Sequence, residues 1–166
     1  MSEVKVLEIL KSALLLEIRG KVFYQKTAAE AQNESVRDFF EQMADEEDGH
    51  IKILSKQYSA YKEKGKFEPQ ALSSFDNAVV DKVLTETFKN NVAAASFESA
   101  AVSAAMGMEQ RAIDLYSQRA TETVDPEEKK LYEWLTRWET LHLETLAEID
   151  RQITETIWHD HSFWPF

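Results

Sequence analysis

Residues 45–50, which read Asp-Glu-Glu-Asp-Gly-His, decide the fold because they place a charged pair inside an apolar helical stripe. Glu47 and His50 lie three residues apart, so on a helix both side chains project from one face and can reach one point beside it. The stripe has the alternating spacing of a helix-bundle seam and consists of Val36, Phe40, Met43, Glu47, His50, Leu54 and Tyr61. We therefore expect a buried carboxylate and a buried imidazole, which need partners from other helices because an unpaired buried charge is costly.

The same pattern returns ninety-two residues later. Residues 13–54 align without a gap with residues 105–146, and ten of the 42 pairs are identical, whereas about three are expected for unrelated segments of average composition. The second stripe contains Tyr132, Leu135, Glu139, His142, Leu146, Ile149 and Ile153. Glu17 also aligns with Glu109, so each half offers a Glu from one helix and Glu-x-x-His from the next.

Helical periodicity and helix-end signals predict four long helices, at about residues 3–31, 34–64, 97–123 and 126–156. Asn33, Ser96 and Asp125 are the expected N-caps, and Pro126 occupies the favoured first helical position of the last helix. Gly65 is the expected left-handed C-cap of the second helix.

The connections between these helices predict their arrangement. Very short loops within residues 3–64 and 97–156 indicate two antiparallel hairpins. Residues 65–95 are too long for a tight turn and are expected to cross the bundle, with a short helix at about 81–88. We therefore predict an all-α fold in which two helical hairpins, joined by a long crossover, form a four-helix bundle in a single domain over residues 1–166.

The composition limits the classes of function. A net charge of −11 argues against nucleic-acid binding, which needs a positive surface, and suits cations better. The absence of cysteine excludes disulfides, thiol nucleophiles and cysteine-ligated iron, including a rubredoxin-type site. Neither a secretory signal nor an apolar run of membrane-spanning length is apparent, so we expect a cytoplasmic protein with no membrane partner.

The two halves together offer four carboxylates and two imidazoles to one point, from Glu17, Glu47, His50, Glu109, Glu139 and His142. Two divalent cations would neutralise the four carboxylates, and oxygen donors with one imidazole per ion suit iron or manganese better than copper or structural zinc. The alternative for Glu17 and Glu109 is a buried ion pair, but the matched Arg19 and Arg111 are two residues away and are expected to face elsewhere. We therefore predict a site for two Fe ions, with Mn as the alternative.

With these residues the chain resembles the ferritin-like superfamily and, within it, the diiron domain of rubrerythrins, over most of its length. The likeness is carried by Glu17 with Tyr24, Glu47 with His50, Glu109 with Tyr116, and Glu139 with His142. It implies that Glu47 and Glu139 bridge the two ions and that each histidine binds one of them. It also implies that Glu17 and Glu109 are terminal ligands.

The resemblance also bears on the residues beside the ligands. It places Tyr24 and Tyr116 next to the ligands as candidate catalytic residues, whereas the alternative is that they are core aromatics. Ala112 departs from the family pattern, because rubrerythrins usually carry a further ligand Glu at that place. The usual rubredoxin-like domain is also missing, so we expect electrons to come from another protein.

Three further features leave alternatives open. Asp45, Glu46 and Asp48 are expected at the surface. Small residues beside the seam acids either leave room for O2 or H2O2 or simply let the helices approach closely; they are Ala13, Gly20, Ala105 and Ala112. The aromatic tail at 157–166, with histidines at 159 and 161, is expected to pack on the bundle or on a second subunit rather than to bind metal.

We expect a non-haem diiron oxidoreductase of rubrerythrin type, a peroxidase or oxidase acting in oxidative stress. It would reduce H2O2 or O2 with electrons from an external donor protein. One alternative is a ferroxidase or iron-handling protein of ferritin type, and another is a metal-free helical interaction module that uses the aromatic tail. We expect a homodimer, because the resemblance implies one and the tail exposes aromatic side chains.

Overall fold

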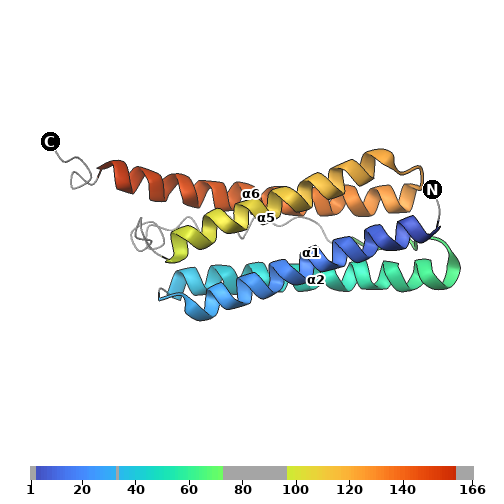
Figure 1. The fold of residues 1–166 in the computed structure, drawn as a ribbon, viewed down its shortest axis with the longest axis horizontal. Helices are drawn as coiled ribbons and strands as arrows, with labels where there is room; N and C mark the ends of the chain where they lie inside the picture. Colours follow the sequence, from blue (N-terminus) through green and yellow to red (C-terminus); the bar gives the residue numbers. More distant parts are fainter. Residues whose placement is uncertain (1–2, 33, 73–96, 160–166) are drawn as a thin grey trace.

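The computed structural model describes residues 3–32, 34–72 and 97–159, which form a bundle of four α-helices (Figure 1). The helices are α1 Glu3–Glu30, α2 Glu34–Lys64, α5 Phe97–Glu122 and α6 Pro126–His159. α1 packs antiparallel to α2, and α5 packs antiparallel to α6. The chain leaves α2 at one end of the bundle and enters α5 at the other end, so these two helices run parallel. The predicted all-α bundle of two hairpins is confirmed.

The helix ends follow the sequence signals wherever the structure describes them. The Oδ1 atom of Asp125 accepts hydrogen bonds from the backbone N–H groups of Glu127 (2.9 Å) and Glu128 (3.1 Å), which is the geometry of an N-cap. Gly65 has a φ of 66°, and its N–H donates to the carbonyl of Tyr61 at 2.9 Å, which ends α2 with a left-handed residue.

The predicted inward faces of the helices are buried, with a polar layer in the middle. Buried apolar residues of the described chain form two clusters, one on each side of the stripe acids and histidines. One cluster includes Tyr24, Phe40 and Met43, and the other includes Leu10, Leu54 and Tyr132. Each such side chain contributes about 1.5–3 kcal/mol by burial, so the two ends hold the bundle together around the polar layer.

One stripe position of α2 differs from its prediction. Tyr61, expected inside, is only half-buried, while Gln57 is 1 % exposed. The Gln57 amide group donates to the carbonyl of Glu68 at 2.7 Å and accepts from the N–H of Glu68 at 3.0 Å. Because both polar groups of the side chain are satisfied, Gln57 takes an inward position and fixes the chain that follows α2.

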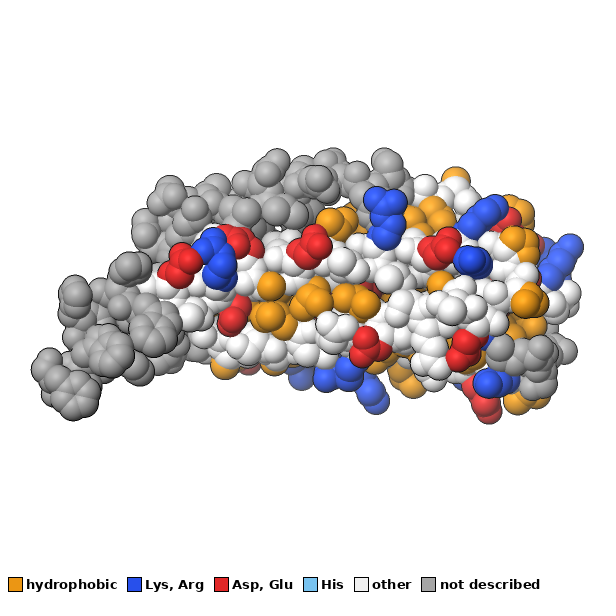
Figure 2. Space-filling view, turned by 90° about the horizontal axis from the view of Figure 1, so that it is seen from above, with side chains coloured by type: hydrophobic (Ala, Val, Ile, Leu, Met, Phe, Trp, Pro, Cys, Tyr) orange, Lys and Arg blue, Asp and Glu red, His pale blue; other side chains and the backbone are white. Residues whose placement is uncertain are grey.

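The surface of the described chain is mixed in character. Figure 2 shows a face on which acidic and basic side chains alternate with apolar ones. Leu15, Ile18 and Val22 on α1 are 52 %, 44 % and 43 % exposed. No helix of the described residues is both long and apolar enough to cross a membrane.

Several predictions fall outside the described residues. These are the N-caps Asn33 and Ser96, the short helix at about 81–88 and the greater part of the crossover. The backbone of α6 extends to His159, and the remainder of the aromatic tail also lies outside.

Candidate metal centre

All six predicted ligands meet in the middle of the bundle, and each is at most 3 % exposed. The first hairpin contributes Glu17 from α1 with Glu47 and His50 from α2; the second contributes Glu109 from α5 with Glu139 and His142 from α6. Their positions follow from the helical period, because each lies on the inward stripe of its helix with buried apolar residues on both sides along the chain. The polar layer is therefore built into the sequence of every helix.

The donors form two overlapping groups, and within each group one ligand atom per residue lies within 4.8 Å of the others. One group is Glu17, Glu47, His50 and Glu139, and the other is Glu47, Glu109, Glu139 and His142. Glu47 and Glu139 belong to both groups. The arrangement is that of two neighbouring cation positions that share two carboxylates.

The shared carboxylates divide their oxygens between the two histidines. Glu47 Oε2 lies 3.4 Å from His50 Nδ1, and its Oε1 lies 3.7 Å from His142 Nδ1. Glu139 Oε1 lies 3.1 Å from His50 Nδ1, and its Oε2 lies 3.3 Å from His142 Nδ1. Two donors that bind one ion at about 2.1 Å, roughly at right or tetrahedral angles, lie about 3.0–3.4 Å apart. The observed spacings are close to that range, so each shared acid can offer one oxygen to each position.

The remaining two acids each accompany one histidine. Glu17 Oε2 lies 3.1 Å from His50 Nδ1, and Glu109 Oε1 lies 3.8 Å from His142 Nδ1. Glu17 and His50 come from the first hairpin, and Glu109 and His142 come from the second. Each candidate position therefore takes its histidine and its unshared Glu from one hairpin. Glu47 and Glu139 contribute to both positions.

Two tyrosines cross-link the hairpins through these acids. The Tyr24 hydroxyl donates to Glu109 Oε1, and the Tyr116 hydroxyl donates to Glu17 Oε1. Burial, followed by the nearby carboxylate charges, raises the pKa of both tyrosines well above the ordinary value, so both hydroxyls remain protonated donors. The tyrosines thus contact the predicted ligands and are more than core aromatics.

His142 has a carboxylate partner on its outer side. Its Nε2 lies 2.7 Å from Glu46 Oε2, and Gln42 donates to Glu46 Oε1 at 3.3 Å. Glu46 was expected at the surface, and that prediction is wrong, because the side chain of Glu46 reaches from α2 across to α6. An ionised carboxylate only accepts hydrogen bonds, so Nε2 carries the proton and Nδ1 is left to face the acids.

His50 lies against aromatic rings instead. Its ring centroid is 5.4 Å from that of Trp134 and 5.9 Å from that of Trp138. Trp138 also lies 6.0 Å from His142, and the two imidazoles are 5.8 Å apart. The tryptophans therefore place apolar surface on the histidine side of the site.

Without metal, the acids and histidines share protons. Burial, then the charge of Glu139, raises the pKa of both Glu47 and Glu109 well above the ordinary value. Burial acts to lower the pKa of His50 and His142, but their contacts with Glu139 and other acids outweigh it and raise the pKa well above its usual range. Burial likewise acts to raise the pKa of Glu139, but the two histidines outweigh it and lower the pKa. Cations at the site would replace these protons.

The residues present fit a pair of cations. Three buried atoms of the site have no hydrogen-bond partner in the described structure, namely Glu47 Oε2, Glu139 Oε1 and His142 Nδ1. Leaving such groups unsatisfied costs about 1–3 kcal/mol each, which bound ions would remove. A Cβ at Gly20 would lie 3.4 Å from Glu47 Cδ, so α1 passes close to that carboxylate. Carboxylate oxygens with one imidazole per position suit iron or manganese.

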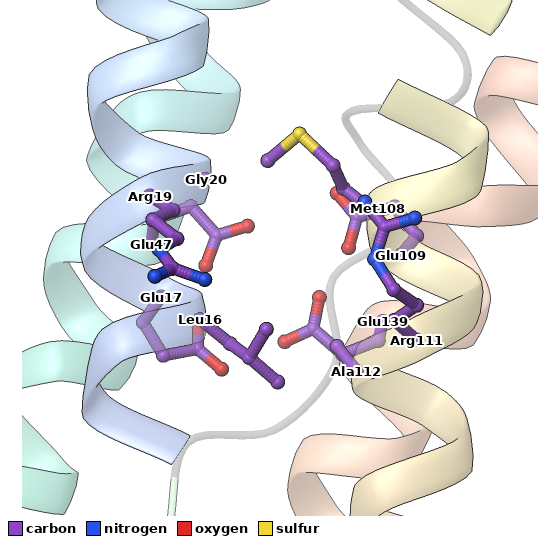
Figure 3. A pocket seen from close by; sticks show the side chains of 10 residues that line it. All are labelled: Leu16, Glu17, Arg19, Gly20, Glu47, Met108, Glu109, Arg111, Ala112 and Glu139. Carbon is purple, nitrogen blue, oxygen red and sulfur yellow. The ribbon is translucent and has the colours of Figure 1, made fainter. Parts of the chain in front are cut away.

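A cavity of about 120 Å³ opens on the carboxylate side of the site, between α1 and α5 (Figure 3). It is lined by Leu16, Glu17, Arg19, Gly20, Glu47, Met108, Glu109, Arg111, Ala112 and Glu139. Arg19 and Arg111 are exposed and form no ion pair with Glu17 or Glu109 in the described structure, as predicted, but they also line the opening, which was not expected. Two residues correspond to about 200° around a helix, but the long arginine side chains reach back to the opening.

Sequence reasoning missed the residues behind the histidines. The internal repeat holds a signal for them, because Gln42 aligns with Trp134 and Glu46 aligns with Trp138. Gln42 and Trp134 lie about two turns before the Glu-x-x-His histidine of their own helix, and Glu46 and Trp138 lie about one turn before it. Because the residue types differ between the halves, a search for identities passes over them.

Comparison with known proteins agrees with this site. The family model described as Rubrerythrin matches residues 8–149. A solved structure of a hypothetical protein from Pyrococcus furiosus is 21 % identical, covers 93 % of this chain and 92 % of its own, and has a TM-score of 0.64, which shows a shared fold. No curated protein matches the chain. Since the family match includes all six donors, the chain belongs to the rubrerythrin family, within the ferritin-like superfamily.

Proposed function

We propose that this protein is a non-haem diiron oxidoreductase that reduces H2O2 or O2 at the four-Glu, two-His centre, with electrons from an external donor protein. The proposal is carried by one observation, the division of the Glu47 and Glu139 oxygens between the two histidines. Carboxylates shared in this way hold two ions as a pair. Family membership supports iron, and manganese is the alternative.

The charge of the site supports two divalent ions rather than one. The four acids, when ionised, carry a charge of −4 in a layer where each is at most 3 % exposed. Two divalent cations balance that charge with both histidines neutral. One cation would leave two uncompensated charges away from water, which is costly.

When bound, two iron ions would supply electrons and Lewis-acid positions for cleavage of an O–O bond. The residues of the chain define where that happens. The cavity between α1 and α5 gives a small oxidant access to the carboxylate side of the site. Trp134 and Trp138 cover the histidine side, so an oxidant approaches from one direction.

The tyrosines are the candidate proton-holding groups. Reduction of H2O2 to two waters consumes two electrons and two protons. Tyr24 and Tyr116 hold protons against the oxygens of Glu109 and Glu17, and their raised pKa values keep those protons in place in the resting protein. We propose that they orient the terminal acids and donate hydrogen bonds at the carboxylate side of the centre.

We propose that the electrons come from another protein. The sequence contains no cysteine, so it cannot form a rubredoxin-type iron site. A separate donor would then restore the reduced centre after each turnover.

The direct test is rapid mixing of the reduced, iron-loaded protein with H2O2 or with O2. We expect about two Fe(II) per chain to be oxidised by each H2O2, and renewed reaction only after a reductant is added. Bound iron that reacts with neither oxidant would contradict the proposal.

The same experiment separates the alternatives. A ferroxidase of ferritin type would go on oxidising repeated additions of Fe(II) and retain the product. A helical interaction module would bind no metal at all.

A further inference from the structure

Arg19 and Arg111 occupy matched positions in the two hairpins and line the same cavity. Figure 3 shows them on opposite sides of the opening, Arg19 from α1 and Arg111 from α5, with the carboxylates of the site between them. Neither forms a hydrogen bond or ion pair with any part of the described chain. Many other basic residues do so, as in the pairs Lys21–Asp48, Lys64–Glu68, Arg119–Glu128 and Arg151–Glu148. The two guanidinium groups are thus available to a ligand.

The local charge at the opening favours an anion once the centre holds its ions. Two divalent cations neutralise the four carboxylates, which leaves the two arginines as an excess positive charge. The protein as a whole carries a net charge of −11, but charges farther away than about 8 Å are largely screened at physiological salt. The nearest groups therefore dominate, and with two divalent ions bound their net charge would be positive.

The form of the cavity limits what can bind. Its volume of about 120 Å³ has room for only a few heavy atoms. A guanidinium is a planar fork that pairs best with planar oxyanions such as carboxylates. A Cβ at Gly107 would lie 3.7 Å from Arg111 Nη1, so the Arg111 guanidinium lies along α5 beside Gly107. Leu16 and Met108 add apolar wall, which suits a short alkyl group.

The floor of the cavity points to a ligand as well. Glu47 and Glu139 line it, are 2 % and 1 % exposed, and each has one oxygen without a hydrogen-bond partner in the described structure. An anion that enters between the arginines thus arrives above the oxygens that would hold the cations.

We propose that the cavity between α1 and α5 is a binding site for a small carboxylate-type monoanion, which is held between Arg19 and Arg111 above the metal centre. This inference rests on the dinuclear centre of the proposed function but not on its reaction with peroxide. It predicts that the cavity binds a small carboxylate more tightly than a neutral molecule of the same shape, while H2O2 or O2 still reaches the centre through the same opening.

The test compares acetate with its neutral analogue acetamide on the Mn(II)-loaded protein. Paramagnetic broadening of the ligand methyl signal in NMR gives the dissociation constant, and metal analysis gives the occupancy. We expect Arg19→Gln/Arg111→Gln to bind acetate about tenfold more weakly at unchanged Mn occupancy. Acetamide should bind poorly to both proteins.

The control removes the same charge elsewhere. Lys129→Gln/Arg151→Gln alters two exposed residues of α6 that lie about 15 Å and 18 Å along the helix from Glu139. We expect its acetate affinity to equal that of the wild type.

Equal acetate binding by wild type and Arg19→Gln/Arg111→Gln, or an equal loss in the control, would overturn the inference. If the protein bound no Mn, metal analysis would show it, and both the inference and the proposed function would fall. If acetate behaved as expected but the iron-loaded protein ignored peroxide and O2, the inference would stand and only the proposed function would fall.

Discussion

The two hairpins supply the same donors but surround their histidines differently. In the first hairpin, Glu46 reaches across to bond His142. In the second hairpin, the aligned residue is Trp138, which packs on His50. The two candidate cation positions therefore match in their predicted ligands and differ in what lies behind the histidines. A carboxylate behind an imidazole makes it a better-oriented and more basic donor.

The turns that join the two helices of each hairpin also differ between the halves. In the second hairpin, Arg119 and Glu128 form a buried ion pair with distances of 2.7 Å and 2.8 Å. The aligned residues of the first hairpin are Thr27 and Val36, which form no such pair. The two halves thus share the residues that face the centre, whereas the residues that pack at the hairpin turns differ between them.

Removing a shared acid has the largest expected effect. Glu47 belongs to both donor groups, so Glu47→Gln should lose both ions, whereas Glu17→Gln should weaken only one. Elemental analysis after gel filtration measures the metal content. Glu41→Gln, which changes an exposed acid of the same helix, should retain both ions. Loss of a single ion from Glu47→Gln would contradict sharing.

Breaking the buried pair of the second hairpin comes next. Glu128→Gln removes the charge of the closest partner of the buried Arg119 and leaves the longer contact with Glu122 at 3.8 Å, which should lower the free energy of unfolding by about 3–5 kcal/mol in urea denaturation. Glu127→Gln removes a partly exposed ion pair with Lys130 and should cost at most about 1 kcal/mol. If both variants lost the same free energy of unfolding, the buried Arg119–Glu128 pair would stabilise the second hairpin no more than a partly exposed pair does.

Raising the pH should destabilise the metal-free protein. The pKa of His50 and of His142 is raised above the unfolded value of about 6.5, so their contribution is complete below that pH and is lost as pH rises through the folded pKa. The raised pKa of Glu47 acts in the same direction, because the unfolded chain ionises first. We expect stability to fall by up to about 1.4 kcal/mol per pH unit for each proton involved.

Thermal unfolding of chelator-treated protein between about pH 6 and pH 9 measures this dependence. His50→Gln and His142→Gln, taken singly, should each flatten part of the curve and show how much each hairpin contributes. A metal-free stability that rises with pH would refute the shared-proton description.

Removing the carboxylate behind one histidine should make the two positions more unequal. Glu46→Ala is expected to weaken the binding of one ion by about 10–100-fold and to leave the other nearly unchanged. Asp45→Ala, at the neighbouring exposed position, is the control. A calorimetric metal titration resolves the two events, and equal weakening of both would contradict the assignment of Glu46 to His142 alone.

The smallest effect is expected where the hairpins are alike. Tyr24→Phe and Tyr116→Phe each remove one hydrogen bond to an acid of the other hairpin and should cost about 1 kcal/mol each. Tyr132→Phe is a matched control, since the buried Tyr132 hydroxyl has no hydrogen-bond partner in the described structure. Unequal losses for Tyr24 and Tyr116 would show that the cross-links are not equivalent.

The parts predicted from the sequence are those that helical periodicity determines. The four helices, the Asp125 and Gly65 caps and the inward direction of Glu17 and Glu109 all follow from spacing along one helix. Alignment of the two halves then brings the six donors together, because like positions in like hairpins meet at one level of the bundle.

The parts that were missed depend on contacts between helices. Glu46 lies off the stripe of α2, and only the rotation of α6 against α2 puts His142 within its reach. Arg19 and Arg111 also lie off the stripes, and their long flexible side chains decide where the charges end up. Residue spacing along one helix contains neither the rotation of a neighbouring helix nor a side-chain rotamer.

Anomalous scattering at the iron edge, from crystals of the iron-loaded protein, tests the shared centre most directly. We expect two peaks in the middle of the bundle, each beside one histidine and one terminal Glu, with Glu47 and Glu139 between them. A single peak, or iron bound away from these six residues, would contradict a dinuclear centre.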